Sequence, residues 1–394
     1  MVIENKQDSV GIVKPQSIDI KKPLKLKNGG ELPSWTLVYE TYGKLNPQRN
    51  NAILICHALS GNHHAAGRHS EEDKKPGWWD DLIGPGKAVD TNKFYVVSPN
   101  NIGGCHGSSG PASINPATQK PYGAAFPQVV VEDWVASQVM LSDHLGIDCW
   151  AAVMGGSLGG MQAIQWAISQ PHRLKSALLI AATSQLHSQN IAFNEIARQA
   201  ILKDPNFHKG DYLLHDTKPT QGLWLARMLG HITYLSEEAM LKKFGRSVGA
   251  SNSNITDDKP NAAGSITDSS MKFEVENYLN YQGEKFAESF DANTYLLMTR
   301  ALDYFDPASE YGGDLSQAIS RTDCSFLVVS FSSDWRFSSA SSRNMVDAII
   351  KAGKRVAYSE IESNQGHDSF LMPIPRYSDA VGKFLSNIGK ELEI

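Results

Sequence analysis

The stretch Ala151–Gln170 reads AAVMGGSLGGMQAIQWAISQ and places one serine, Ser157, between two pairs of glycines. The residues before Ser157 form a short apolar run typical of a buried strand, whereas the residues after it follow a helical pattern. The segment Gly155–Gly159 thus matches G-x-S-x-G at a strand-to-helix turn, where small residues two before and two after the serine avoid a collision. We predict that Ser157 is a nucleophile, with the N–H groups of a helix N-terminus beside it. The alternative is a glycine-rich contact between helix and sheet that contains an incidental serine.

The composition indicates a large globular chain without a strong charge bias. Its 394 residues are 41% hydrophobic, which is enough for one large core or two smaller ones. A net charge of −5 argues against a nucleic acid or an anionic membrane as partner, because either would favour a clustered basic surface. No apolar run approaches the roughly 20 residues of a membrane helix, and the N-terminus lacks the apolar core of a signal peptide. We therefore expect a soluble, cytoplasmic protein in which the four widely spaced cysteines are reduced.

Short apolar runs alternate with helical patterns along the chain, which is typical of an α/β protein with a largely parallel sheet. The expected core strands are Ala52–Cys56, Phe94–Ser98, Trp150–Met154, Ala177–Ala182, Ser325–Phe331 and Arg355–Ile361. The interval between the fourth and fifth strands is helix-prone, so we expect a core of residues 1–184 and 317–394 with a helical lid inserted at 185–316. Within the lid, residues 247–270 lack aromatic side chains and are rich in Ser, Asn, Asp and Gly, which predicts a mobile loop.

A nucleophilic serine needs a base, and the base needs a carboxylate that orients it. In α/β hydrolases both partners follow the serine, in the order acid and then histidine, on loops after late strands. Asp334 follows the expected strand Ser325–Phe331, and His367 follows Arg355–Ile361 and is the last histidine of the chain. We therefore predict an α/β-hydrolase fold in which Ser157, His367 and Asp334 form a catalytic triad.

The segment CHALSGNHH, residues 56–64, follows the first expected core strand and supplies an early loop. An oxyanion hole needs a backbone donor from such a loop, so we predict that Leu59 N–H acts beside Leu158 N–H. Several histidines of this region raise the question of a metal site, namely His57, His63, His64 and His69. They form no helical H-x-x-x-H pair and have no obvious acidic ligand set, so we expect no metal and no permanently bound cofactor.

Long stretches of the chain, in order over residues 32–384, resemble one family, the homoserine O-acyltransferases of methionine biosynthesis, which have the α/β-hydrolase fold. The stretches are LVYETYGKLN, CHALSG, GWWDDLIGPGKAVDT, NNIGGCHGSSGPASINP, VMGGSLGGMQ, ARMLGHITYLS, FDANTYLLMTRALDYFD and GHDSFL. The resemblance implies that Ser157, Asp334 and His367 form the triad. It also implies a ping-pong mechanism, in which the serine takes the acyl group from an acyl-CoA and passes it to homoserine.

The resemblance assigns homoserine binding to Arg227 and Asp368. This assignment agrees with the chemistry of a zwitterion, because a cation can hold its carboxylate and an anion its ammonium group. The lid at 185–316 would restrict water, which would otherwise hydrolyse the acyl-enzyme. By family likeness we expect the lid to be the surface of a homodimer as well.

Arg336 lies two residues after Asp334 in the segment DWRF, and it decides which donor we expect. Acetyl-type and succinyl-type members of the family share the fold, but only a succinyl group carries a terminal carboxylate that an arginine can bind. We therefore predict succinyl-CoA as the co-substrate. Acetyl-CoA is the alternative donor, and an exposed loop arginine is the alternative role of Arg336.

Three other functions stay open at the level of sequence. A serine esterase would use the same triad to hydrolyse simple esters, with little dependence on an amino-acid acceptor. A non-catalytic binding module with this fold is disfavoured, because it would seldom keep a complete triad and both oxyanion loops. Serine could also replace homoserine as acceptor, because one methylene in a pocket is worth only about 1–3 kcal/mol.

Overall fold

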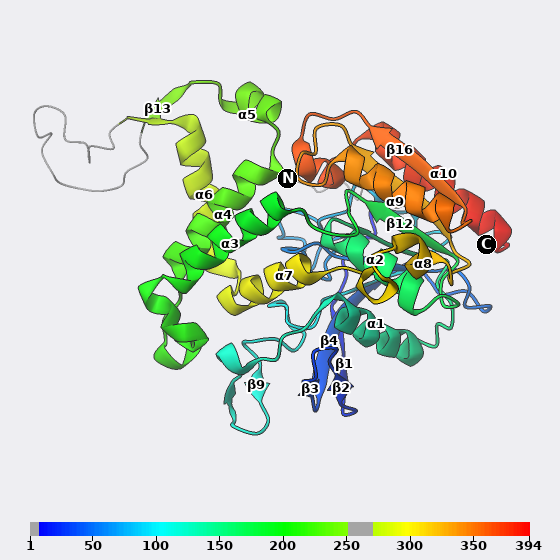
Figure 1. Cartoon of the computed structure of the whole chain (residues 1–394), viewed down its shortest axis with the longest axis horizontal. Helices are drawn as coiled ribbons and strands as arrows, with labels where there is room; N and C mark the ends of the chain where they lie inside the picture. The colour runs from blue at the N-terminus through cyan, green and yellow to red at the C-terminus, as the bar shows by residue number, and fades with distance from the viewer. Residues whose placement is uncertain (1–7, 251–270) are drawn as a thin grey trace, which may run out of the picture.

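The structure is a computed structural model that describes residues 8–250 and 271–394. Its centre is an eight-stranded sheet with the order β1-β4-β8-β5-β11-β12-β15-β16 (Figure 1). Neighbouring strands from β8 to β16 run parallel, whereas β4 is antiparallel to both of its neighbours. The sequence prediction of a largely parallel α/β sheet is therefore confirmed. The strands span β1 (Gln16–Ile20), β4 (Trp35–Tyr42), β5 (Ala52–Cys56), β8 (Tyr95–Pro99), β11 (Ala152–Gly156), β12 (Ser176–Ile180), β15 (Ser325–Phe331) and β16 (Val356–Ile361).

Side chains of the central strands alternate between two hydrophobic cores, one on each face of the sheet. In β5, Leu54 and Cys56 belong to one core, and Ile53 and Ile55 belong to the other. This period of two explains why the strand is apolar throughout, since a parallel sheet covered on both faces buries every residue. Helices α1, α2, α8 and α9 are among those that contribute to the first core, and α10 contributes to the second. These helices are α1 (Val131–Leu145), α2 (Leu158–Ser169), α8 (Leu315–Ile319), α9 (Ser339–Lys351) and α10 (Pro375–Glu391).

The chain between β12 and β15 is mainly helical and lies to one side of the sheet (Figure 1). Its helices are α3 (Ser188–Leu202), α4 (Thr220–Tyr234), α5 (Glu237–Phe244), α6 (Glu274–Ser289) and α7 (Ala292–Tyr304). Helix α4 packs against both α3 and α6. Helix α8 spans the boundary predicted after residue 316 and packs against α9, so the chain has returned to the core by Leu315. The lid function of this segment stays a prediction.

The loop predicted at residues 247–270 falls largely outside the described residues, which stop at 250 and resume at 271. Inside the predicted range, residues 248–250 form a strand instead of a loop: β13 (Val248–Ala250) pairs antiparallel with β14 (Met271–Phe273). The other short strands are β2 (Leu24–Lys25), β3 (Glu31–Leu32), β6 (Ile83–Gly84), β7 (Val89–Asp90), β9 (Ile114–Asn115) and β10 (Lys120–Pro121). The 3₁₀ helices are η1 (Gly123–Ala125), η2 (Pro205–Gly210), η3 (Tyr212–His215), η4 (Ser309–Tyr311) and η5 (Gly366–Leu371).

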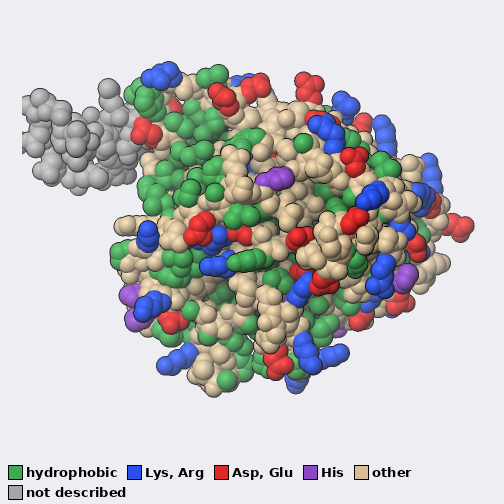
Figure 2. Space-filling view, viewed as in Figure 1, with side chains coloured by type: hydrophobic (Ala, Val, Ile, Leu, Met, Phe, Trp, Pro, Cys, Tyr) green, Lys and Arg blue, Asp and Glu red, His purple; other side chains and the backbone are tan. Residues whose placement is uncertain are grey.

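Hydrophobic side chains remain exposed on the helices between β12 and β15, and Figure 2 shows them gathered on the left side of the view. They include Ile196 on α3, Leu225 and Ile232 on α4, Leu241 on α5 and Tyr281 on α6. None of the helices within the described ranges combines the length and the hydropathy that crossing a bilayer requires.

Candidate active site

Ser157 occupies a sharp turn between β11 and α2, with a φ of 56° and a ψ of −122°. A positive φ is strained for a residue with a side chain, so the surrounding packing must maintain this conformation. The flanking glycines permit that packing. A Cβ on Gly159 would lie 2.0 Å from the carbonyl oxygen of Cys56, and one on Gly155 would lie 2.5 Å from the same atom. The G-x-S-x-G spacing therefore lets the turn press directly against the end of β5.

Ser157, His367 and Asp334 form one chain of hydrogen bonds. The Oγ atom of Ser157 lies 2.9 Å from Nε2 of His367, whose Nδ1 lies 2.7 Å from Oδ2 of Asp334. The other carboxylate oxygen of Asp334 accepts the backbone N–H groups of Arg336 at 3.0 Å and Phe337 at 2.8 Å. All three side chains are buried. The structure thus brings the three predicted residues together in the geometry of a nucleophile, a base and an orienting acid.

Aromatic rings hold the imidazole of His367 in place. The ring of Phe337 stacks on it with centroids 4.6 Å apart, and Phe370 meets it edge to face at 5.5 Å. Tyr234 lies on a third side at 6.1 Å. The sequence prediction missed these rings, although one signal was present: Tyr234 follows Arg227 by seven residues, which places both on one face of α4.

The two predicted oxyanion donors lie at the ends of adjacent strands β5 and β11. Within the described residues, neither Leu59 N–H nor Leu158 N–H donates to a protein acceptor, as an oxyanion hole requires. The loop that carries Leu59 is held by His57, whose Nε2 accepts Asn101 N–H at 3.0 Å while Nδ1 contacts the Ala58 carbonyl at 2.7 Å. Burial lowers the pKa of His57 to about 4, so the imidazole is neutral and can accept this hydrogen bond.

Arg336 is buried beside the triad and is not an exposed loop residue. Its guanidinium donates to Thr233 Oγ1 at 2.6 Å and to Asn194 Oδ1 at 2.9 Å, and it lies 5.1 Å from the ring of Tyr234. Both hydrogen-bond partners are neutral, and no carboxylate of the described chain lies within ion-pair distance of it. A buried charge without a counter-ion is costly. The guanidinium is therefore ready to bind an anion that enters the cavity beside Ser157.

Arg227 and Asp368 carry opposite charges close to each other without forming an ion pair among the described side chains. Burial raises the pKa of Asp368, and the charge of Arg227 counteracts that rise. The guanidinium of Arg227 lies 4.8 Å from the ring of Phe286 and 6.0 Å from that of Tyr234, and its buried Nε has no hydrogen-bond partner in the described part of the protein. Both groups thus retain capacity for a charged ligand.

These groups meet around one cavity of about 130 Å³. Its lining includes Leu59, Ser157, Tyr234, Arg336 and Asp368. Arg227 does not line the cavity itself, but its guanidinium lies 6.0 Å from the ring of Tyr234, which does. The cavity thus brings a serine hydroxyl together with a cation and a carboxylate that form no ion pair within the described part of the chain.

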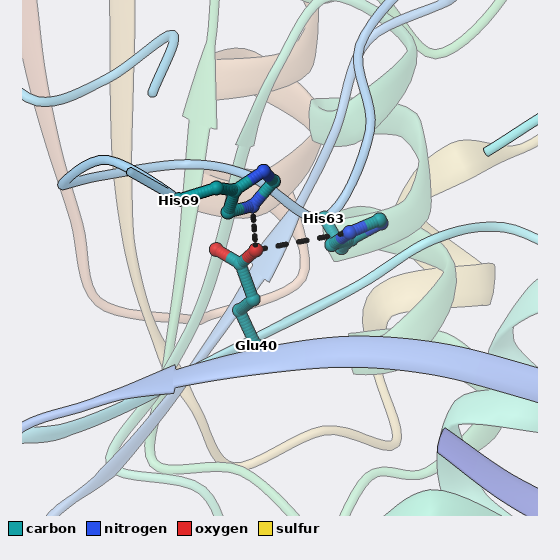
Figure 3. Close-up of side chains that lie close together, drawn as sticks. All are labelled: Glu40, His63 and His69. Carbon is teal, nitrogen blue, oxygen red and sulfur yellow. Dashed lines mark hydrogen bonds and ion pairs between the residues drawn. The ribbon is translucent and has the colours of Figure 1, made fainter. Parts of the chain in front are cut away.

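A second cluster of polar side chains lies on the neighbouring loop and was not predicted as a unit. The fully buried carboxylate of Glu40 lies between His63 and His69, with its Oε1 atom 3.7 Å from Nε2 of His63 and 2.5 Å from Nε2 of His69 (Figure 3). Burial lowers the pKa of His63 to about 4, so its imidazole is neutral. We call these three residues the Glu40 cluster. Sequence reasoning missed it because Glu40 lies on β4, far along the chain from the histidines.

Comparisons with known proteins agree with this architecture. A family model described as the alpha/beta hydrolase fold matches residues 51–372. A homoserine O-acetyltransferase structure from Bacillus anthracis superposes with a TM-score of 0.85 at 31% identity, covering 95% of this chain and 98% of that one. The structure of esterase E22 superposes with a TM-score of 0.84 at 28% identity, covering 95% of this chain and all of that one. The fold and the hydrogen-bonded serine, histidine and aspartate define the class of the protein, the α/β hydrolases.

Relatives with curated names identify the family of this chain within the α/β hydrolases. The homoserine O-succinyltransferase of Marinobacter nauticus is 58% identical over 385 residues, which cover 98% of each chain. That of Halorhodospira halophila is 57% identical over 392 residues and the full length of both chains. The protein belongs to the homoserine O-succinyltransferase family, which confirms the resemblance identified from sequence.

Proposed function

We propose that the protein transfers the succinyl group of succinyl-CoA to the hydroxyl of L-homoserine, a step of methionine biosynthesis. The names of its relatives support this function, and one structural observation supports succinyl-CoA over acetyl-CoA as the donor. The buried guanidinium of Arg336 shares a cavity with Ser157, and its partners among the described residues are neutral. A succinyl carboxylate supplies the missing negative charge, whereas an acetyl group would leave the cation uncompensated.

In the first half-reaction, Ser157 takes the acyl group. His367 Nε2 accepts the hydroxyl proton as the Oγ atom attacks the thioester carbonyl, and Asp334 stabilises the resulting imidazolium. The negative charge that develops on the carbonyl oxygen is stabilised by the N–H groups of Leu59 and Leu158. When the carbon–sulfur bond breaks, the imidazolium protonates the leaving thiolate. Free CoA departs, and a succinyl ester remains on Ser157.

In the second half-reaction, homoserine accepts the group. Asp368 binds its ammonium and Arg227 its carboxylate, which directs the side-chain hydroxyl towards the ester on Ser157. His367 removes the hydroxyl proton, the oxygen attacks the ester carbonyl, and the proton returns to Ser157 as O-succinylhomoserine leaves. The helical lid over the site limits entry of water, which would otherwise compete as acceptor.

A CoA-release assay that crosses two donors with two acceptors tests this proposal. Succinyl-CoA with homoserine is expected to turn over fastest among the four combinations of succinyl-CoA or acetyl-CoA with homoserine or serine. Incubation with succinyl-CoA alone should leave a succinyl group on the Ser157 peptide by mass spectrometry, and the Ser157→Ala variant should lose at least about three orders of magnitude in turnover. Release of CoA only after homoserine is added would contradict the ping-pong order.

The comparison of donors and a separate assay of ester hydrolysis distinguish the two alternatives. Preference for acetyl-CoA would identify an acetyltransferase, which is the activity named for the Bacillus anthracis structure. Rapid hydrolysis of simple esters without dependence on homoserine would identify an esterase, as named for the E22 structure.

We further infer that the protein is a homodimer that associates through the exposed apolar residues of α3 to α6. Neither substrate requires a nucleic acid or a membrane, and acyl-CoA is the one organic co-substrate that the mechanism needs. A cytoplasmic location stays a prediction from the sequence.

A further inference from the structure

The Glu40 cluster combines a buried carboxylate with two imidazoles whose Nε2 atoms face the same oxygen (Figure 3). The ligand atoms of the three side chains all lie within 4.8 Å of one another. The cluster takes no part in the mechanism described above. We propose that it binds one zinc ion through Glu40 Oε1, His63 Nε2 and His69 Nε2.

The chemical identity of the ligands favours zinc over the common hard cations. Two imidazoles and one carboxylate form a set that binds Zn²⁺ with one position left for water. Mg²⁺ and Ca²⁺ instead prefer oxygen ligands. Access is also suitable, because the His69 side chain is 41% exposed while those of His63 and Glu40 are 9% and 0% exposed. A hydrated ion can enter past His69 and meet the two buried ligands.

The surroundings of Glu40 support a metal ligand. Its second oxygen, Oε2, accepts the hydroxyl of Tyr42 at 2.7 Å and faces Nδ1 of His64 at 3.0 Å. These contacts hold the carboxylate so that Oε1 points between His63 and His69. Hydrogen-bonded partners of this kind orient metal-binding carboxylates and strengthen metal affinity. His64 and Tyr42 are therefore positioning residues, and the three members of the Glu40 cluster are the ligands.

The distances require only a small local adjustment. Tetrahedral zinc with bonds of about 2.0–2.1 Å separates its ligand atoms by about 3.3 Å. The His63 contact of 3.7 Å is already near this value, whereas the 2.5 Å contact of His69 must lengthen. His69 can move outward because it is the exposed member. A neutral imidazole with its proton on Nδ1 leaves Nε2 free to bind the ion.

Zinc bound here would tie two parts of the chain together. Glu40 lies on β4, whereas His63 and His69 lie on the loop after β5 that also carries Leu59. The hydroxyl of Tyr42 holds the same loop by accepting the N–H groups of Ala65 and Ala66. A metal that binds only the folded chain raises its stability. The role we infer is structural, and it does not depend on which acyl group the enzyme transfers.

Zinc binding to the chelator-stripped, full-length protein tests the proposal, measured by competition with a chromophoric chelator in the absence of CoA. Omitting CoA matters because its thiol binds zinc. We expect one zinc ion per chain in the wild type and a loss of affinity of at least about tenfold to a hundredfold in Glu40→Gln and His69→Ala. His208→Ala is the matched control, because His208 stacks on His215 at the surface and offers adventitious imidazole ligands elsewhere.

A second set of measurements, on His69→Ala, distinguishes the loss of a zinc ligand from misfolding of the Glu40 variant. His69→Ala removes a half-exposed side chain, and circular dichroism should show that it folds normally. Zinc should raise the melting temperature of the wild type and of His208→Ala, but not that of His69→Ala. Co²⁺ in place of Zn²⁺ should give the visible absorption of a four-coordinate site in the same proteins. Absence of zinc binding by the wild type, or equal binding by wild type and both ligand variants, would overturn the proposal.

Discussion

At the scale of single residues, the surroundings of Ser157 contain charged groups that form no ion pair with any described residue. Among the described residues, the guanidinium of Arg336 donates to a threonine and an amide, and Asp368 forms no ion pair with the nearby cation of Arg227. Such arrangements cost stability in the free protein, and they are expected where a charged substrate completes them.

Arg336→Leu should lower kcat/KM for succinyl-CoA by about tenfold to a hundredfold, because charge-assisted hydrogen bonds worth roughly 1.5–3 kcal/mol are lost. Acetyl-CoA has no carboxylate to lose, so its kcat/KM should change little or rise. Both donors are to be compared at saturating homoserine. Arg336→Lys is the matched control, since it keeps the charge and should retain part of the preference. Equal losses on both donors would show that Arg336 instead supports the loop that carries Asp334.

Asp368 should make homoserine binding depend on pH. Its carboxylate must be ionised to hold the ammonium group, and burial raises its pKa, so the KM for homoserine should increase as the pH falls towards that raised pKa. The increase should begin at a higher pH than for an ordinary aspartate, whose pKa is about 3.9. Steady-state KM values for homoserine, measured across pH, test this.

Asp368→Asn serves as the control for that pH dependence. The variant should have a raised KM for homoserine that no longer changes with pH over the same interval, while the KM for succinyl-CoA stays close to that of the wild type. A wild-type pH profile retained in the variant would assign the titration to another group.

At the scale of elements, the site depends on how closely α2 approaches the end of β5. The backbone at Gly159 touches the Cys56 carbonyl, and this contact sets the position of Ser157 and of Leu158 N–H relative to the Leu59 loop. The predicted strands agree with the observed ones to within two residues. Trp150, for example, was predicted to begin a strand, but it precedes β11 and forms an isolated bridge with Leu174. The prediction missed this boundary because an apolar side chain does not reveal where the hydrogen bonds between strands begin.

Gly159→Ala should therefore damage both stability and activity. The added Cβ would lie 2.0 Å from the carbonyl oxygen of Cys56, and overpacking of this kind costs about 1–3 kcal/mol. Urea denaturation gives the loss of unfolding free energy, and the CoA-release assay gives the loss of turnover. Gly389→Ala in α10 is the control, since its Cβ would meet atoms no closer than 3.6 Å. An alanine in that helix should be neutral or stabilising by up to about 1 kcal/mol. Equal behaviour of the two variants would contradict the packing argument.

At the scale of the whole molecule, the helices between β12 and β15 have two faces with different surroundings. One face supplies Arg227, Thr233 and Tyr234 to the surroundings of the active site, and the other exposes apolar side chains to solvent (Figure 2). On α4, Leu225 and Ile232 are seven residues apart, so they share a face, and each is 48% exposed. Clustered exposed apolar residues of this kind mark association surfaces.

The double variant Leu225→Asp with Ile232→Asp should convert the expected dimer into a monomer, because two buried carboxylates at an apolar interface would be desolvated without partners. Sedimentation velocity at several protein concentrations measures this change. Ile350→Asp is the matched control, because Ile350 is 59% exposed on α9 of the core. A wild-type monomer, or a dimer that persists in the double variant, would refute the proposed surface.

Local sequence was sufficient to predict the elbow at Ser157 and the order of Ser157, Asp334 and His367. These features depend on short-range patterns: glycines at fixed spacing, apolar runs of strand length, and polar residues directly after such runs. Because parallel strands bring their carboxyl ends to one edge, residues that follow those strands come together whenever the strands are neighbours. The sequence could therefore predict this part of the site without knowledge of any side-chain contact.

The tertiary structure alone decided which residues from distant parts of the chain lie next to the carboxyl ends of these strands. Arg336 meets Thr233 and Asn194, which lie 103 and 142 residues away, and this packing buries its cation where no described side chain supplies a counter-ion. Likewise, Glu40 of β4 meets His63 and His69 of the loop that follows β5, which brings scattered histidines to one carboxylate. Burial and the distances between charges arise from the packing of distant segments, and no local pattern in the sequence encodes them.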